Sequence, residues 1–226
     1  MENYRDRIAN GRIAIRQYKK EDRGYVRDIA YQTAFLGEPA SVFFDDKEIL
    51  ADFLTLYFTD YEPESCFVAE NNARVVGYLI GARDANLLKN IFQFKIAPSL
   101  LFKTVIKGTL IKKKNLIFFF NSLVSFLRGE FLVPDFYKIY PALLHINIKK
   151  DFRNKGIGSE LIRTYLRYLL NKKISGVHLA TISDTAGIFF IKQGFNLLYK
   201  NRRTHFRYIL NKDIQIYAYG KRLLKH

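Results

Sequence analysis

A turn with two glycines, between an apolar segment and an amphipathic one, constrains the fold of this 226-residue chain more than any other feature. The apolar segment is Ala142 to Ile148, the turn is Arg153-Asn154-Lys155-Gly156-Ile157-Gly158, and Gly156 to Asn171 has helical spacing. Glycines at a helix start let backbone amides approach an anion, and the helix dipole adds attraction. The pattern predicts strand, phosphate-binding turn and helix, although two glycines would also suit a turn without a ligand.

The rest of the chain alternates between strand-like and helix-like patterns. The expected strands are Ile13–Tyr18, Cys66–Glu70, Arg74–Ala82, Val177–Ile182, Phe195–Tyr199 and Thr204–Leu210. The expected helices are Lys19–Phe35, Lys47–Tyr57 with Asp46 as its cap, and Asp184–Gln193 closed by Gly194. This order implies an α/β fold with helices on the faces of a sheet.

The segment from Ala85 to Tyr140 has a different character, with nine basic residues against two acidic ones and many Phe and Leu. A helix through Leu116 to Arg128 would carry one narrow polar stripe, so we expect most of its circumference to be buried. Pro98 and Pro134 are expected at helix ends, because proline disfavours helix at the preceding residue. This segment is interpreted as a basic helical insertion.

Composition limits the classes of protein that fit. An apolar content of 49% supplies a packed core, which excludes a disordered chain. Lysine and arginine number 37 against 21 acidic residues, and the net charge of +16 favours phosphates, nucleic acid or anionic membranes without choosing among them. Cys66 is the single cysteine and is interpreted as a core thiol. His178 and His205 fit no metal-binding pattern with it, so no metal is expected.

Neither the amino terminus nor the longest apolar stretch has the pattern of a membrane or export segment. Met1 to Arg7 mixes charges and precedes no apolar run, unlike a secretory signal. Leu116 to Leu127 falls short of the roughly 20 residues that a membrane span needs. A cytoplasmic location is therefore expected.

Two motifs resemble those of a known family. Arg153-Asn154-Lys155-Gly156-Ile157-Gly158 is similar to the Arg/Gln-x-x-Gly-x-Gly/Ala signature of the GNAT superfamily of acyl-CoA-dependent N-acyltransferases. The run from Ala186 to Phe195 resembles the second signature of that superfamily, Ala-x-x-Phe-Tyr-x-x-x-Gly-Phe. The strand at Tyr140 to Ile148 is also similar to a bacterial branch related to the acetyltransferase-like domains of some O-GlcNAc hydrolases. The chain is thus identified as one domain over 1–226, with the insertion at about 85–140.

The resemblance implies a GNAT-like splayed mixed sheet with flanking helices, and acetyl-CoA as the cofactor. Its pantetheine would lie between the strand ending at Ile148 and the strand Val177–Ile182, bonded by backbone groups of Ile146 and Ile148. Ser183 stands where the family often has Asn and is expected to contact the cofactor. The residues implied at the pyrophosphate are those of the turn: Arg153, Asn154, Lys155, Gly156, Ile157, Gly158 and Ser159.

The implied reaction is direct transfer of an acetyl group from acetyl-CoA to a primary amine of a small molecule, such as an amino sugar or an amino acid derivative. His145 shares a strand face with Asn147 and would accept the proton of the amine, although a structural histidine would also fit. Phe190 stands where the family often has a proton-donating Tyr, so Tyr199, Tyr217 or water would have to replace it.

Phe190 and Ser183 also support an alternative, a catalytically inactive module that binds acyl-CoA or a partner. The insertion is expected to pack over the acceptor side of the sheet, with a homodimer interface or a membrane contact as the other uses of its apolar faces. Nucleic-acid or anionic-membrane binding is the less favoured principal role.

Overall fold

The structure is a computed structural model and describes residues 13–224. The amino terminus, in which the sequence predicts no secretory signal, lies outside the described residues. Among residues 13–224, no helix is both long enough and apolar enough to cross a membrane.

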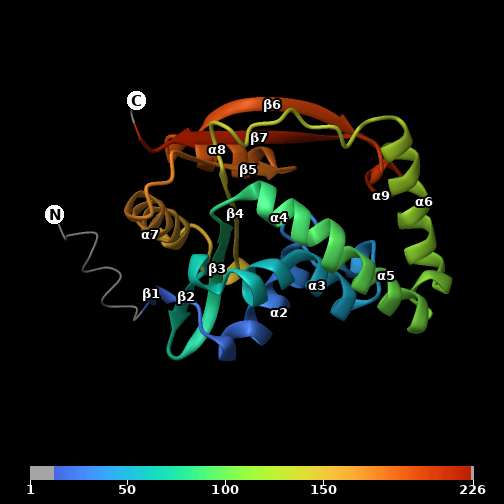
Figure 1. The fold of residues 1–226 in the computed structure, drawn as a ribbon. Coiled ribbons are helices and arrows are strands. Elements are labelled where there is room, and N and C mark those ends of the chain that lie inside the picture. Colours follow the sequence, from blue (N-terminus) through green and yellow to red (C-terminus); the bar gives the residue numbers. More distant parts are fainter. Residues whose placement is uncertain (1–12, 225–226) are drawn as a thin grey trace.

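Seven strands form one mixed sheet in the order β1-β2-β3-β4-β5-β7-β6 (Figure 1). Strands β4 and β5 pair in parallel, and all other neighbours pair antiparallel. The mixed sheet with helices on both faces confirms the predicted α/β class. The strands are β1 Ile13–Gln17, β2 Phe67–Asn71, β3 Arg74–Ala82, β4 Ala142–Ile148, β5 Gly176–Thr181, β6 Asn196–Arg203 and β7 Ile214–Arg222.

Alternating strand residues divide the core between the two faces of the sheet. Phe67, Ala69 and Leu79 face helices α7 and α8, whereas Val68 and Tyr78 face α2 and the α4–α5 region. A third cluster joins α3, α6 and the segment around Phe43. The helices are α2 Arg23–Thr33, α3 Lys47–Leu56, α4 Ala85–Ile91, α5 Ala97–Ile106, α6 Lys113–Leu127, α7 Ile157–Asn171, α8 Asp184–Lys192 and α9 Arg207–Leu210.

Several local predictions are confirmed by hydrogen bonds and backbone angles. The Asp46 side chain accepts from the amide of Ile49 and caps α3. Gly194 has a φ of +80°, and the Phe195 amide donates to the Phe190 carbonyl, which closes α8. The hairpin of β2 and β3 turns at Asn72 and Ala73, both with positive φ.

The predicted strand Thr204–Leu210 is wrong, because this segment turns and then forms the short helix α9. The last strand is β7, which inserts between β5 and β6. Its alternation of Ile214, Ile216 and Ala218 with Gln215 was a strand signal that the sequence interpretation missed.

The predicted helix end at Pro98 is also wrong. A π-helical turn, Phe92–Ile96, links α4 to α5, and Pro98 lies within the first two residues of α5. The Ala97 amide donates to the Phe92 carbonyl five residues earlier, and the first turn of a helix needs no proline amide. The helical stretch therefore passes through this position.

Helix α6 forms where predicted but does not bury most of its circumference. Its fully buried residues are the polar Asn115 and Ser125, whereas Leu116, Phe120 and Leu123 are each more than half exposed. Asn115 accepts from the Asp45 amide and donates to the Thr109 carbonyl, so its burial is compensated by hydrogen bonds.

Candidate functional site

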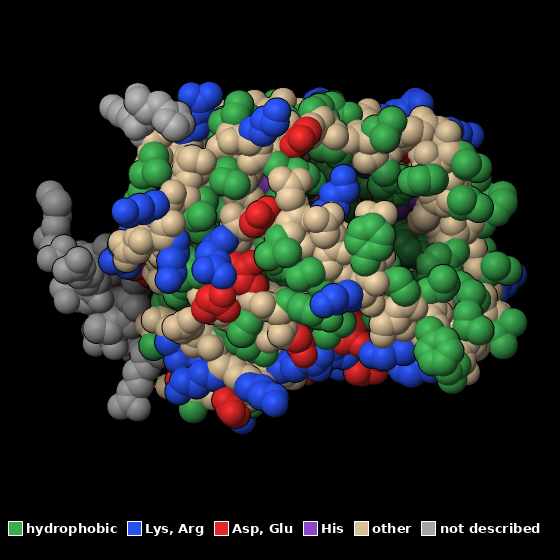
Figure 2. Space-filling model, viewed as in Figure 1, with side chains coloured by type: hydrophobic (Ala, Val, Ile, Leu, Met, Phe, Trp, Pro, Cys, Tyr) green, Lys and Arg blue, Asp and Glu red, His purple; other side chains and the backbone are tan. Residues whose placement is uncertain are grey.

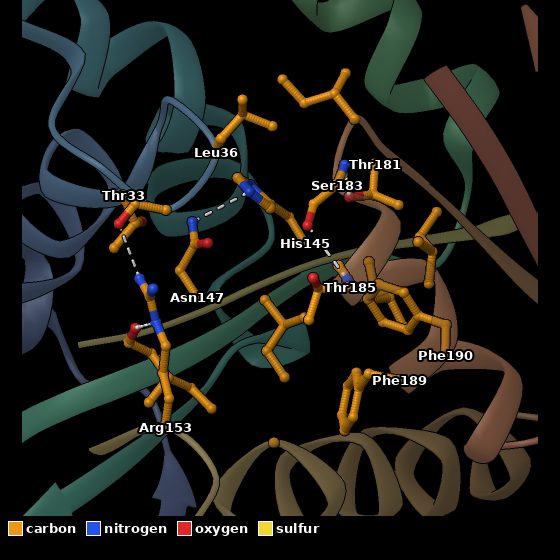
Figure 3. A pocket seen from close by; sticks show the side chains of 18 of the residues that line it. Thr33, Leu36, His145, Asn147, Arg153, Thr181, Ser183, Thr185, Phe189 and Phe190 are labelled. Carbon is orange, nitrogen blue, oxygen red and sulfur yellow. Dashed lines mark hydrogen bonds between the residues drawn. The ribbon is translucent and has the colours of Figure 1, made fainter. Parts of the chain in front are cut away.

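Strands β4 and β5 separate soon after they meet. They pair at Ala142 with Val177 and at Leu143 with His178, and beyond these two pairs they diverge. A cavity of about 740 Å³ lies at the gap, lined by the residues of β4 from Leu144 to Ile148 and by those from Leu179 to Ile182 (Figure 3). Splaying exposes backbone hydrogen-bonding groups that a paired strand would use, so an extended ligand can bond there.

The glycine turn lies at one end of this cavity. Gly156 is the N-cap of α7 with a φ of +77°, a left-handed conformation that residues with a Cβ adopt at a cost. No side chain caps this helix start, and its first amides have no partner within the helix. Together with the helix dipole, these free amides give the turn the chemistry to bind an anion.

Gly158 and Ser159 join the turn to α8. A Cβ on Gly158 would lie 3.1 Å from Cζ of Phe189, so this glycine permits close packing of the two helices. The Gln193 side-chain amide donates to Ser159 Oγ at 3.0 Å. The two sequence motifs thus contact each other in space, and each fixes the position of the other.

Arg153 ties the turn to two other parts of the cavity wall. Its Nε donates to the carbonyl of Ile148 at 3.0 Å, and Nη2 donates to the carbonyl of Gly37 at 3.0 Å. The guanidinium thus fixes the end of β4 and the loop after α2 around the cavity. It also occupies the Ile148 carbonyl, one of the two groups expected to bond pantetheine.

His145 lies on the face of the sheet opposite to the core cluster that α7 covers. It lies beside Asn147 (Figure 3), and its ring contacts Tyr78. The Asn147 side-chain amide donates to Tyr78 Oη at 2.8 Å, and its nitrogen lies 3.2 Å from Nε2 of His145. Burial lowers the pKa of His145 to about 4. The imidazole is therefore neutral at physiological pH, and Nε2 is its acceptor nitrogen because the amide donates.

The two departures from the family signature have clear positions. Phe190 lines the cavity wall but is almost fully buried, with its ring against Phe195 and Tyr219. Ser183 Oγ accepts from the Ala186 amide at 3.3 Å and caps α8, while its residue still lines the cavity. Neither Tyr199 nor Tyr217 lines the cavity, and the Tyr199 hydroxyl donates to the Leu132 carbonyl.

Most of the predicted site residues meet at this one cavity. His145, Ile146, Ile148, Arg153, Asn154, Gly156, Gly158, Ser159 and Ser183 line it. Lys155 does not, since its ammonium lies over the ring of Phe152, and Ile157 is buried in the core. Sequence reasoning missed Thr33, Leu36 and Thr185, which no motif singles out and which only the tertiary fold brings here.

The insertion does not contribute to the cavity wall. No residue of 85–140 lines the cavity, so the insertion does not roof it. Ile96 and Leu100 pack on the sheet face that α2 covers, which is also the face of His145, and Phe118 packs on Phe43. Within residues 13–224, no cluster of His, Cys, Asp and Glu could hold a metal ion.

A family model and several solved structures resemble this chain. Residues 110–195 match the model of the acetyltransferase (GNAT) family. This match spans the glycine turn and the second motif, and it supports the predicted assignment as a GNAT acetyltransferase. No curated protein matches the sequence significantly.

Solved structures share the GNAT fold over almost the whole chain. The crystal structure of SsHAT is 22% identical with a TM-score of 0.65, and the match covers 94% of this chain and 99% of that one. The structure of yncA from Salmonella typhimurium, solved with its cofactor acetyl-CoA, is 12% identical with a TM-score of 0.57 and 95% of each chain covered. The polyamine N-acetyltransferase of Drosophila melanogaster is 13% identical with a TM-score of 0.57, covering 93% of this chain and 100% of that one.

Proposed function

We propose that this GNAT protein transfers an acetyl group from acetyl-CoA to a primary amine of a small molecule, by direct transfer. The observation that carries the proposal is the cavity that passes through the sheet where β4 and β5 separate. The glycine turn lies at the α7 side of this gap, and His145 lies at the α2 side. An acyl donor and an acceptor can therefore approach each other from opposite faces.

The residues around the gap fit acetyl-CoA, which when bound supplies an acetyl group activated as a thioester. The first amides of α7 would hold the pyrophosphate, and the apolar walls from Ile146, Ile148 and Phe189 suit a pantetheine chain. The unpaired edge of β4 would bond the pantetheine amides, as Ile146 has no β5 partner. Ser183 would donate its hydroxyl proton, because its oxygen already accepts from Ala186.

The chemistry of the acceptor side favours a small, weakly charged amine. Among residues 13–224, no Asp or Glu lines the cavity, so a polycationic acceptor would meet no opposing charge there. Thr33 and Asn147 instead offer a hydroxyl and an amide group, which suit hydrogen bonds to hydroxyl groups of an acceptor. An amino sugar meets this description better than a polyamine does.

His145 is proposed as the group that accepts the proton of the amine. The lowered pKa leaves the ring neutral at physiological pH but makes it a weak base, so the acceptor is proposed to bind as the neutral amine, whose N–H proton passes to Nε2 as the C–N bond forms. The amine would have to displace the Asn147 amide from Nε2, which makes Asn147 a positioning residue for the ring. Phe190 has no proton to give, so water entering the open cavity is proposed to protonate the leaving thiolate.

Thiol release from acetyl-CoA, measured against a panel of amino sugars, amino acid derivatives and polyamines, tests the proposal. We expect His145→Gln to lower kcat by roughly a hundredfold while the affinity for acetyl-CoA is retained. His205→Gln is the matched control, because His205 has a similarly lowered pKa of about 4 and does not line the cavity. In wild type, kcat/KM should show no inflection from His145 near pH 6.5.

The second candidate, an inactive acyl-CoA-binding module, is favoured by the enclosed aromatic ring of Phe190 at the usual proton-donor position. Tight binding of acetyl-CoA without thiol release for any amine would select it. Equal turnover of His145→Gln and wild type would remove His145 from the mechanism.

A further inference from the structure

The outer surface of α5 and α6 exposes a group of large apolar side chains. Figure 2 shows hydrophobic side chains gathered over these two helices, at the right of the view. Each member of the group is more than half exposed. We call it the apolar surface; it consists of Leu101, Phe102, Val105, Ile106, Ile111, Leu116, Phe120, Leu123, Phe126 and Leu127.

The apolar surface is fixed by specific contacts on the inner side of α6. Asn115 is held by Asp45 and Thr109, and Ser125 Oγ lies 3.0 Å from Thr204 Oγ1. Phe118 and Phe119 pack on Phe44. Rotating the helix to bury its apolar side would leave these buried polar groups without partners, so the exposed orientation is the stable one.

Positive charge surrounds the apolar surface. Lys112 and Lys113 are exposed, and within residues 13–224 neither forms an ion pair. Arg128 is also exposed, and Lys103 and Lys107 are only loosely paired, at 3.4 and 4.0 Å from carboxylates of α3 and its cap. The nearby Glu130 is buried and accepts from the Thr204 amide. The outward charge of this region is therefore positive.

We propose that the apolar surface binds an anionic lipid bilayer, with its Phe and Leu side chains in the interface and its lysines at the headgroups. Exposed apolar side chains beside lysine and arginine are the combination that interfacial binding requires. A second copy of the chain fits less well, because pairing two such surfaces would also bring two groups of exposed basic side chains into one interface. The backbone of a nucleic acid would satisfy the lysines but leave the aliphatic side chains in water. The inference is independent of the proposed acyl transfer.

Co-sedimentation of the full chain with vesicles tests this inference. Vesicles of equal parts phosphatidylcholine and phosphatidylglycerol should bind the wild type at low salt, and pure phosphatidylcholine should bind it much less. Raising the salt should release it, because exposed charges are screened. The double variant Lys112→Glu, Lys113→Glu should lower the affinity by about tenfold or more, since each lysine near an anionic surface contributes about 1 kcal/mol.

The apolar contribution is tested by the triple variant Phe120→Ser, Leu123→Ser, Leu127→Ser. It should abolish sedimentation while circular dichroism and melting temperature stay as in wild type, because these side chains are exposed. The control changes three side chains elsewhere that are also at least half exposed, Ile188→Ser, Ile191→Ser and Leu197→Ser, and should bind as wild type does. The control for charge is Lys20→Glu with Arg167→Glu, both exposed and outside the surface.

Four results would overturn the inference. The first is that the wild type stays in solution with anionic vesicles at low salt. The second is that the control triple variant loses binding as fully as the test variant does. Alternatively, lipid-free wild type is a dimer by sedimentation velocity and the test variant is a monomer, which would make the surface a dimer interface. Finally, the wild type binds single-stranded RNA and the apolar variant does not, which would assign the surface to nucleic acid.

Discussion

Helices α6 and α7 have the same length of 15 residues, and both are amphipathic. They differ in which side chains are fully buried: apolar ones in α7 and polar ones in α6. In α7 the apolar residues Leu161 and Tyr165 are fully buried, and Arg163 and Arg167 are exposed. In α6 the polar residues Asn115 and Ser125 are fully buried, and Leu123 is exposed. Periodicity shows which side chains share a face, but hydrogen-bond partners elsewhere in the chain decide which face turns inward.

The largest expected effect is on stability, when one apolar leucine in each helix is replaced by alanine. Leu161→Ala should lower the free energy of unfolding by about 2 to 5 kcal/mol, because it leaves a cavity in the core beside α7. Leu123→Ala removes the same atoms from α6 but should change stability by less than about 0.5 kcal/mol, since the side chain is exposed. Urea unfolding of both variants measures the difference. Similar losses for the two would mean that α6 buries this face in solution.

This difference also marks how far the sequence predicts the fold. The strands and helices around both motifs were predictable, because Leu161, Ile162 and Tyr165 follow helical spacing and the turn carries a family signature. The partners of Asn115 and Ser125 were not, because Asp45 and Thr204 are distant in sequence. The strand β7 was missed despite its alternation, because the preceding run from Thr204 was assigned to the sheet in its place.

The residues of the candidate site also fall into two groups, those that a local sequence pattern predicts and those that only tertiary packing brings together. The turn around Gly156 and the neighbours of His145 on β4 were predictable, since each is a local pattern. The hydrogen bond from Arg153 to the Gly37 carbonyl and the approach of Thr33 to the cavity depend on how α2 packs over the sheet. No local pattern encodes such contacts.

A second prediction sharpens the contrast at two glycines with similar backbone angles. Gly156 before α7 has a φ of +77°, and Gly108 before the turn that leads to α6 has a φ of +60°. Alanine at either position should cost about 1 kcal/mol of stability or more, because a Cβ disfavours this conformation. Only Gly156→Ala should weaken acetyl-CoA binding in calorimetry, by about tenfold, which corresponds to about 1.4 kcal/mol. Unchanged affinity for Gly156→Ala would move the phosphate site elsewhere.

A third prediction concerns acid stability and compares His145 at the cavity with His205 near α6. Burial lowers the pKa of both to about 4, below the ordinary value of 6.5. Between pH 6.5 and 4 the unfolded chain therefore binds more protons than the folded one, so the free energy of unfolding falls as the pH is lowered through this window.

Each histidine should contribute a loss of roughly 1 kcal/mol or more across that window. His145→Gln and His205→Gln should each flatten the dependence between pH 6.5 and 4, because glutamine does not titrate. Thermal melts over this range measure the slope. Slopes equal to wild type in both variants would show that neither ring is held neutral by burial.

The smallest expected effect lies at the polar face of α6. Ser125→Ala removes the hydroxyl that lies 3.0 Å from Thr204 Oγ1. Thr204 keeps its hydrogen bond to the Glu130 carboxylate at 2.9 Å, so no buried acceptor loses its only partner. The cost should therefore be only about 0.5 kcal/mol, at the low end for a hydrogen bond. Ser122→Ala, on a less buried part of the same helix, should cost less still. If chemical denaturation shows Ser122→Ala to be the more destabilising of the two, the polar side of α6 does not face the core, and the exposed apolar surface opposite it loses its structural basis.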